Sequence, residues 1–299
     1  MKQYLELFME KTGLPEDSRE SLFRAAEVLF SGEAGRAMET AVRRFYADAG
    51  LRRLPAVGRL LRSIAEKTGV HAYTVDFLFF VSCSERLRER YRAWNLPEEI
   101  FWDSMKDLRY KLLECREVHG VWGTFVGSWF PMFFTLERFA LGRMQYEYAS
   151  FPRAYYEKAG VTLRRGDPVY NMHIPSAGPL TRESRMDSYR RAYRFFEREL
   201  DGRPLPIVCH SWLLFPKNEE FFLAGSNLVD FLHDFDIIDT GEQDKFWDGW
   251  RVFGRDWELP PERLPRRTSL QRGCADWLKA GRKTGEGFGV LLFDGEKIL

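Results

Sequence analysis

The spacing of the apolar residues changes near residue 135, and this change limits the folds open to the chain. From Met1 to about His119 apolar side chains recur every three or four residues, which is the spacing of one helix face. From Leu136 they alternate with polar side chains, as in a strand with one buried face. In a chain of 299 residues we therefore predict two domains, a helical one at 1–134 and a mixed one at 135–299.

Glycines and prolines divide the first half into helical segments. Gly13, Gly50 and Gly69 stand where such segments end, because glycine readily takes the left-handed conformation that closes a helix. The first predicted helix ends before Gly13, and the second follows Pro15. The next four are predicted at 33–49, 54–67, 70–94 and 98–118. The aromatic and glycine-rich stretch 120–134 is predicted as a further helix packed between the halves, and a buried irregular segment lining a cleft is the alternative.

The second half alternates strands and helices, which is typical of an α+β or α/β domain with a mixed sheet. We expect strands at 136–148 and 169–174, with the side chains of Gln145 and Glu147 on the polar side of the first. The remaining predicted elements are a helix at 182–200, a strand at 206–215, a helix at 227–235, a strand at 247–253, a helix at 269–282 and a strand at 287–293.

The stretch His173–Leu180, with the sequence HIPSAGPL, joins a predicted strand to a predicted helix. Backbone amides in such a loop and at a helix start lack partners, and the helix dipole adds partial positive charge, so the junction suits an anion such as a phosphate. Ser176, Ala177 and Gly178 would offer amides, and Thr181 a helix cap and a hydroxyl. The alternative is a loop that only turns the chain and caps the helix.

Five runs, in this order, resemble a bacterial acyltransferase-domain family: LGRMQYE, HIPSAGPL, CHSWLL, SNLVDF and TSLQR. That family joins a helical N-acyltransferase domain to a GNAT-like C-terminal domain. The resemblance implies the acyl-CoA N-acyltransferase fold and a donor that is acetyl-CoA or another acyl-CoA. It also implies that Ile174, Ser176, Ala177, Gly178 and Thr181 hold the CoA pyrophosphate. The superfamily's usual Gln or Arg with spaced glycines is absent here, and the proline at 179 has no N–H to donate.

Acyl transfer to an amine needs a base for the amine and an acid for the departing thiolate. His173 and His210 are the candidate pair, and Glu147 is a further candidate base. We expect direct attack in a ternary complex, with a small-molecule or peptide amine as acceptor. Adjacent strand residues face opposite sides, so His210 cannot readily activate Cys209 or Ser211 as a nucleophile. A non-catalytic protein that senses a CoA ester or a peptide is the alternative.

Charge and cysteine content narrow the class of protein. The net charge of +1, from 45 basic and 44 acidic residues, provides no overall field for nucleic acid. We expect no metal, because no metal-binding motif occurs, and we expect the four separated cysteines to be reduced. We find no signal peptide and no run of about 18 apolar residues, so we expect a cytoplasmic protein that inserts in no membrane. The oligomeric state stays open.

A cluster of basic residues in the helical half has two readings. Arg43 and Arg44 are predicted to lie near Arg52 and Arg53, and Arg86, Arg88, Arg90 and Arg92 are interleaved with glutamates. They could form a contact surface for a phosphate or an acidic partner. Solvated helix faces with charge pairs along the helix are the reading we favour.

Overall fold

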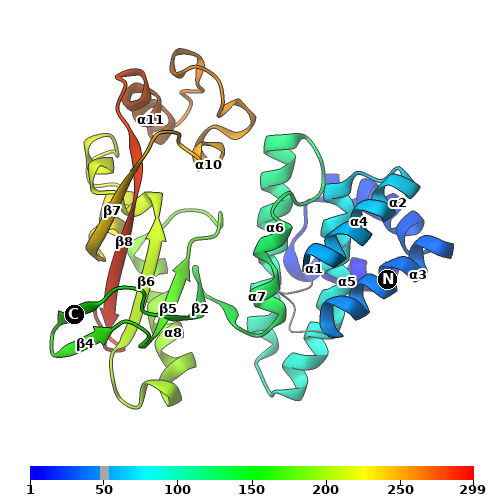
Figure 1. The fold of residues 1–299 in the computed structure, drawn as a ribbon, viewed down its shortest axis with the longest axis horizontal. Coiled ribbons are helices and arrows are strands. Elements are labelled where there is room, and N and C mark those ends of the chain that lie inside the picture. The colour runs from blue at the N-terminus through cyan, green and yellow to red at the C-terminus, as the bar shows by residue number, and fades with distance from the viewer. Residues whose placement is uncertain (48–53) are drawn as a thin grey trace. The chain divides into compact units, whose positions relative to one another are not determined.

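The computed structural model describes residues 1–47 and 54–299 and divides them into two compact units. The first unit is Met1–Ala140, and the second is Leu141–Leu299 (Figure 1). The first is helical and the second contains a mixed sheet, so the predicted fold class is confirmed. The predicted end of the third helix at 48–50 and the basic residues Arg52 and Arg53 lie outside the described residues.

Helices of the first unit follow the predicted segments closely. They are α1 (Lys2–Thr12), α2 (Arg19–Leu29), α3 (Gly32–Ala47), α4 (Leu54–Thr68), α5 (Ala72–Ala93), α6 (Glu98–His119) and the short α7 (Pro131–Phe134). Gly13 and Gly69 follow α1 and α4 with φ of +66° and +69°, the left-handed conformation expected of a residue that ends a helix. The core is rich in rings: Phe45 contacts Phe79 and Phe134, with ring centroids 5.5 Å apart in both pairs.

The stretch 120–134 is not the helix that we predicted. Gly120 ends α6 with φ of +72°, and the chain is then irregular except for one short turn and α7. A side chain at Gly123 is excluded, because its Cβ would lie 2.4 Å from the carbonyl carbon of Tyr73. Gly123 therefore permits close backbone contact with the start of α5, and the spacing of apolar residues does not reveal a contact of that kind.

The arginines of α5 contact neighbouring residues of the helical unit. Arg88 is paired with Glu98 and stacks on Trp102, with its guanidinium 5.1 Å from the ring centroid. Arg90 donates to the carbonyl of Phe134 at 2.5 Å. These two arginines thus have structural partners, which favours the reading of ordinary charged helix faces for this part of the cluster.

The six-stranded sheet has the strand order β1-β2-β5-β6-β8-β7, and its strands from β2 onward belong to the second unit. Its strands are β1 (Arg138–Leu141), β2 (Met144–Ser150), β5 (Pro168–His173), β6 (Leu205–Ser211), β7 (Asp236–Gln243) and β8 (Thr284–Phe293), while β3 (Tyr155–Lys158) and β4 (Val161–Arg164) form a separate hairpin. The pairs β2–β5, β6–β8 and β7–β8 are antiparallel, whereas β5 and β6 are paired in parallel, and α8 (Arg182–Leu200) is the crossover between β5 and β6.

Each face of this sheet has its own cover. On one face α8 packs against β2 and β5: the Tyr146 hydroxyl lies 3.1 Å from the Ser188 hydroxyl, and the rings of Tyr170 and Phe196 are 4.0 Å apart. On the other face the β3–β4 hairpin covers one end of the sheet. There Tyr156 and Leu163 pack in a cluster with buried residues of β5, β6 and β8. The other end of this second face carries polar side chains, and these form the candidate site.

Two predicted elements of the second unit are wrong. The stretch 247–253 contains the short helix α10 (Gly249–Phe253) and no strand, whereas the strand β7 at Asp236–Gln243 was missed. The strand β7 lies at the edge of the sheet, and most of its side chains are exposed or half-buried, so it lacks the apolar alternation of an inner strand. The single strand predicted at 136–148 is in fact β1 and β2, separated by a turn at Gly142, where φ is +75°.

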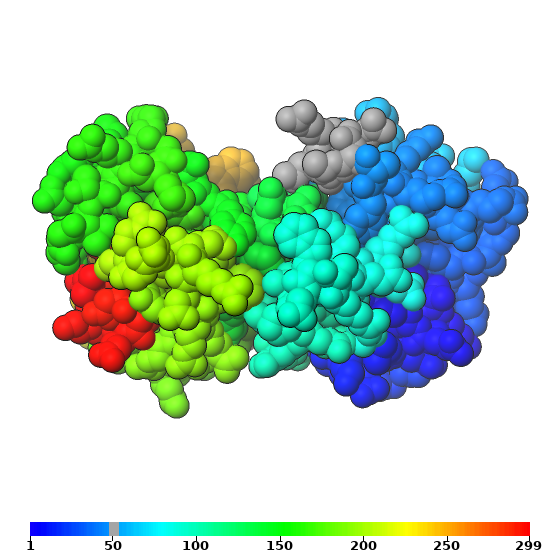
Figure 2. All heavy atoms as spheres, turned by 90° about the horizontal axis from the view of Figure 1, so that it is seen from below, coloured from blue at the N-terminus to red at the C-terminus, as the bar shows by residue number. Residues whose placement is uncertain are grey.

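The chain end folds back onto the second unit. The amide of Leu299 donates to the carbonyl of Leu292 at 3.0 Å, and Gly295 lies against the ring of Tyr193 in α8. Figure 2 shows this terminal segment, in red, at the surface beside the yellow-green atoms of the α8 region. No helix among residues 1–47 and 54–299 is both long and apolar enough to cross a membrane.

Candidate active site

The parallel strands β5 and β6 separate at their carboxyl ends. Their ladder pairs Tyr170 with Ile207 and Asn171 with Val208, and goes no further. On its other side β6 stays paired with β8 as far as Ser211 and Gly287. Because loops and helix starts meet at the carboxyl ends of parallel strands, the point where such neighbours diverge is a common place for a ligand.

His173 and Glu147 form a half-buried pair at this point. The antiparallel register sets Glu147 opposite Asn171, so Glu147, Asn171 and His173 share one face of the sheet. The Glu147 Oε2 and His173 Nε2 atoms are 2.9 Å apart, and these side chains are 16% and 18% exposed. The Asn171 amide nitrogen lies 3.3 Å from the same imidazole nitrogen. The tertiary structure thus joins two of the three candidate acid-base residues.

His210 has a different partner. It lies two residues beyond the last β5–β6 rung, on the same face, and its Nε2 is 3.2 Å from Oε1 of Glu286 in β8. The other carboxylate oxygen of Glu286 accepts from the Gln243 amide at 3.1 Å. Sequence reasoning missed Glu286. It lies in the glycine-rich run GEGFGV, whose pattern does not indicate an acid-base residue, and only the register between β6 and β8 brings it near His210.

The loop after β5 has the form of an anion-binding junction, with one difference from expectation. Thr181 caps α8, its hydroxyl accepting from the Ser184 amide at 3.2 Å. The Ala177 amide donates to the Pro175 carbonyl at 2.8 Å, so that amide is engaged within the loop. The amides of Gly178 and Thr181 have no acceptor in the described part of the chain. A donor phosphate would therefore meet the later part of the loop and the first turn of α8.

Other predicted loop residues flank this surface. Ile174 is half-buried directly after β5, and Ser176 is exposed. Gly178 has φ of +96°, and nothing lies within 4 Å of the place where a Cβ would stand. The requirement for glycine at 178 is thus conformational, because a β-branched residue seldom adopts this φ.

Covalent catalysis by the neighbours of His210 is not favoured. Cys209 is buried, and burial raises the pKa of its thiol to about 12, which keeps it protonated near neutral pH. The Ser211 hydroxyl accepts from the Leu213 amide at 3.2 Å and begins a short turn at Trp212–Leu214. Gly287 of GEGFGV leaves room for this turn, since a Cβ there would lie 2.1 Å from the Leu214 carbonyl oxygen.

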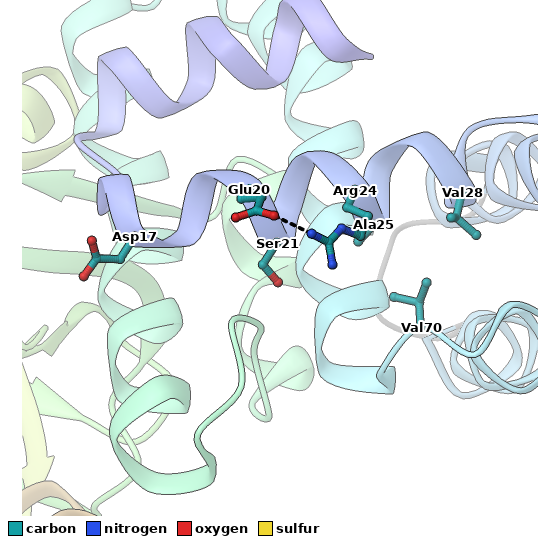
Figure 3. A pocket seen from close by; sticks show the side chains of 7 residues that line it. All are labelled: Asp17, Glu20, Ser21, Arg24, Ala25, Val28 and Val70. Carbon is teal, nitrogen blue, oxygen red and sulfur yellow. Dashed lines mark hydrogen bonds and ion pairs between the residues drawn. The ribbon is translucent and has the colours of Figure 1, made fainter.

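The helical unit has a hollow of about 490 Å³ between α2 and the segment around Val70 that joins α4 to α5 (Figure 3). It is lined by Asp17, Glu20, Ser21, Arg24, Ala25, Val28 and Val70. Glu20 and Arg24 pair one helical turn apart, which is an ordinary arrangement on a solvated helix.

Within the described ranges no three His, Cys, Asp or Glu side chains gather as a metal site would require.

Comparison with known proteins assigns both units. Residues 3–136 match the family model of the N-acyltransferase N-terminal domain, and residues 139–291 match that of the GNAT-like C-terminal domain. No curated protein sequence matches the chain.

Solved structures share the whole fold. One is an acyltransferase mutant in complex with octanoyl-CoA, at 23% identity and a TM-score of 0.73, covering 98% of this chain and 88% of that one. Another is an acyltransferase in complex with decanoyl-CoA and teicoplanin, at 22% identity and a TM-score of 0.64, covering 96% of this chain and 99% of that one. At this identity the likeness concerns the fold.

Proposed function

Since the chain belongs to the family that joins an N-acyltransferase N-terminal domain to a GNAT-like C-terminal domain, we propose that it moves an acyl group from acyl-CoA to an amine. The observation that carries this proposal is the His173–Glu147 pair beside the separation of β5 and β6. The segment 173–181 thus begins at the His173–Glu147 pair and ends at backbone amides that have no acceptor among the described residues.

The residues can be given roles in direct transfer. The amine nitrogen forms a bond to the thioester carbonyl carbon, the carbon–sulfur bond breaks, and the amine proton passes to a base. His173 is our candidate base, because the Glu147 carboxylate at 2.9 Å stabilises the imidazolium that forms. His210, beside Glu286, is the candidate donor of a proton to the CoA thiolate. The loop through Gly178 and Thr181 would hold the pyrophosphate.

The acceptor is proposed as a small-molecule or peptide amine. Two of the similar structures contain teicoplanin or 10C-teicoplanin, which is consistent with an acceptor of this kind. The octanoyl-CoA and decanoyl-CoA of such structures make medium-chain donors worth testing beside acetyl-CoA. The four buried free cysteines fit the cytoplasmic location that we continue to propose.

A second function has a specific observation in its favour. Pro179 has no N–H and the Ala177 amide is engaged with Pro175, so the loop offers fewer donors than a run of free amides would. A protein that senses a CoA ester or a peptide without turnover could function with this smaller number of amide donors. The two functions differ in whether thiol is released.

Calorimetric titration with acetyl-, octanoyl- and decanoyl-CoA tests the first step. We expect at least one donor to bind, and a lack of binding to all of them would rule out the acyltransferase proposal. Amines are then screened for release of CoA thiol, with the His173→Gln and His210→Gln variants for comparison. Turnover that falls in these variants supports catalysis, whereas binding without turnover of any amine favours the sensor.

A further inference from the structure

One arginine outside the predicted site contacts the loop after β5. Arg143 lies in the turn between β1 and β2 and donates to three carbonyls of the loop after β5. Its Nη1 is 2.9 Å from the Pro175 oxygen, its Nη2 is 2.7 Å from the Gly178 oxygen, and its Nε is 3.3 Å from the Pro179 oxygen. A guanidinium suits this arrangement because its donors form a rigid planar fork.

A second arginine holds the end of the same loop from inside the unit. Arg185 of α8 is fully buried, and its Nη1 donates to the Leu180 carbonyl at 2.6 Å. Its charge is balanced by Asp234, with Nε and Oδ2 2.6 Å apart, and the Tyr189 hydroxyl donates to the same carboxylate at 2.9 Å. The carbonyls of Pro175, Gly178, Pro179 and Leu180 are thus bound by the guanidinium groups of these two arginines.

The direction of the loop amides follows from these contacts. All described peptide bonds are trans, so each carbonyl points opposite to the N–H of the next residue. Because Arg143 binds the Pro179 carbonyl, the N–H of Leu180 faces away from Arg143. In the same way the N–H of Thr181 faces away from Arg185, which binds the Leu180 carbonyl. Neither amide has an acceptor among the residues that the structure describes.

We propose that Arg143 and Arg185 are positioning residues. By binding the loop carbonyls they orient the amides of Leu180 and Thr181 toward the CoA pyrophosphate. This inference rests on the proposed function. It also gives a reason why the spaced glycines of other such loops are dispensable here. Glycine lets a backbone turn its amides outward, whereas in this chain the two guanidinium groups impose that orientation.

The Arg143→Gln variant separates this role from a general effect on the fold. Calorimetry measures the affinity for CoA and for pantetheine, which has no pyrophosphate. We expect roughly tenfold weaker CoA binding, as for the loss of charge-assisted hydrogen bonds that order a site, and an unchanged affinity for pantetheine. Arg198→Gln, at an exposed position of α8, is the matched control and should bind CoA like the wild type.

Chemical rescue provides a readout that does not depend on pantetheine. Guanidinium ion at millimolar concentration should restore part of the CoA affinity of Arg143→Ala, and should leave Arg198→Ala unchanged. Equal CoA affinity of the wild type and Arg143→Gln would overturn the inference while leaving the proposed function intact. An equal loss for CoA and pantetheine, without rescue, would overturn it as well. A wild-type protein that binds no CoA would count against the proposed function itself.

Discussion

At the scale of single residues, the histidines of the second unit differ in what surrounds them. His173 is 18% exposed and pairs with Glu147, whereas His210 is 52% exposed and pairs with Glu286. His233 also has a carboxylate partner, Glu219, at 2.6 Å, but both side chains are exposed. Water screens an exposed pair and lets its side chains move, so the half-buried pair has the best-defined geometry of the three.

The first prediction concerns that half-buried pair. Glu147→Gln keeps the shape of the side chain but removes the charge that would stabilise an imidazolium at His173. We expect the turnover number to fall by roughly tenfold to a hundredfold, with the affinity for acyl-CoA unchanged. Steady-state rates and calorimetry measure the two quantities.

Glu219→Gln is the matched control, because it removes the carboxylate of an exposed His–Glu pair that we place outside the site. It should leave the turnover number at the wild-type value. Equal rates for Glu147→Gln and the wild type would remove Glu147 from the mechanism.

At the scale of elements, the site depends on how one strand leaves its neighbour and how a loop begins a helix. The β5–β6 ladder ends at Asn171 and Val208, and α8 begins at Arg182. The eight residues between His173 and Arg182 must turn the chain while directing amides outward. Gly178, with φ of +96°, is the position in that turn where a side chain would be strained.

The second prediction uses two glycines with nearly the same conformation. Gly178→Val and Gly166→Val both place a β-branched residue at a φ near +95° where no atom lies within 4 Å of the new Cβ. Both should lower stability to a similar degree, but only Gly178→Val should weaken CoA binding, by about tenfold or more. Calorimetry and thermal unfolding measure these effects.

Circular dichroism should show that the helical unit stays folded in both valine variants. A similar loss of CoA affinity in the two variants would show that strain alone is responsible. The assignment of the loop to the pyrophosphate would then fail.

At the scale of the whole molecule, each unit has its own core and its own buried charges. In the second unit, buried Arg185 is balanced by Asp234. In the helical unit, burial raises the pKa of Asp76 from 3.8 to about 6, and the nearby Arg62 opposes that shift only in part. A carboxyl group that ionises at higher pH when folded favours the folded state while it is protonated. The contribution of Asp76 to the free energy of unfolding is therefore fully present below pH 4 and is lost as the pH rises through 6.

The third prediction is that Asp76→Asn stabilises the full chain at neutral pH. At pH 7.5 the gain in the free energy of unfolding should be about 2 kcal/mol, and at pH 4 it should be close to zero. Urea unfolding at the two pH values measures the difference, with the exposed Asp17→Asn as control. A gain that is the same at both pH values would show that the ionisation of Asp76 is not its source.

Local patterns were enough for much of the architecture. The change of apolar period separated a helical from a mixed unit, and Gly13, Gly69 and Thr181 marked helix ends and a helix start where the structure has them. Alternation also placed Glu147 on the opposite side of its strand from Tyr146, which is buried under α8. Each of these depends on residues close together in the chain, so the sequence by itself determined them.

The remaining features depend on contacts between distant segments. The pairing of His210 with Glu286 follows from the register of β6 and β8. The hydrogen bonds from Arg143 to the loop after β5 form because the β1–β2 turn lies beside that loop. The irregular course after Gly120 follows from a close approach to Tyr73. Such contacts join residues tens of positions apart and have no periodic trace, so only the tertiary structure decided them.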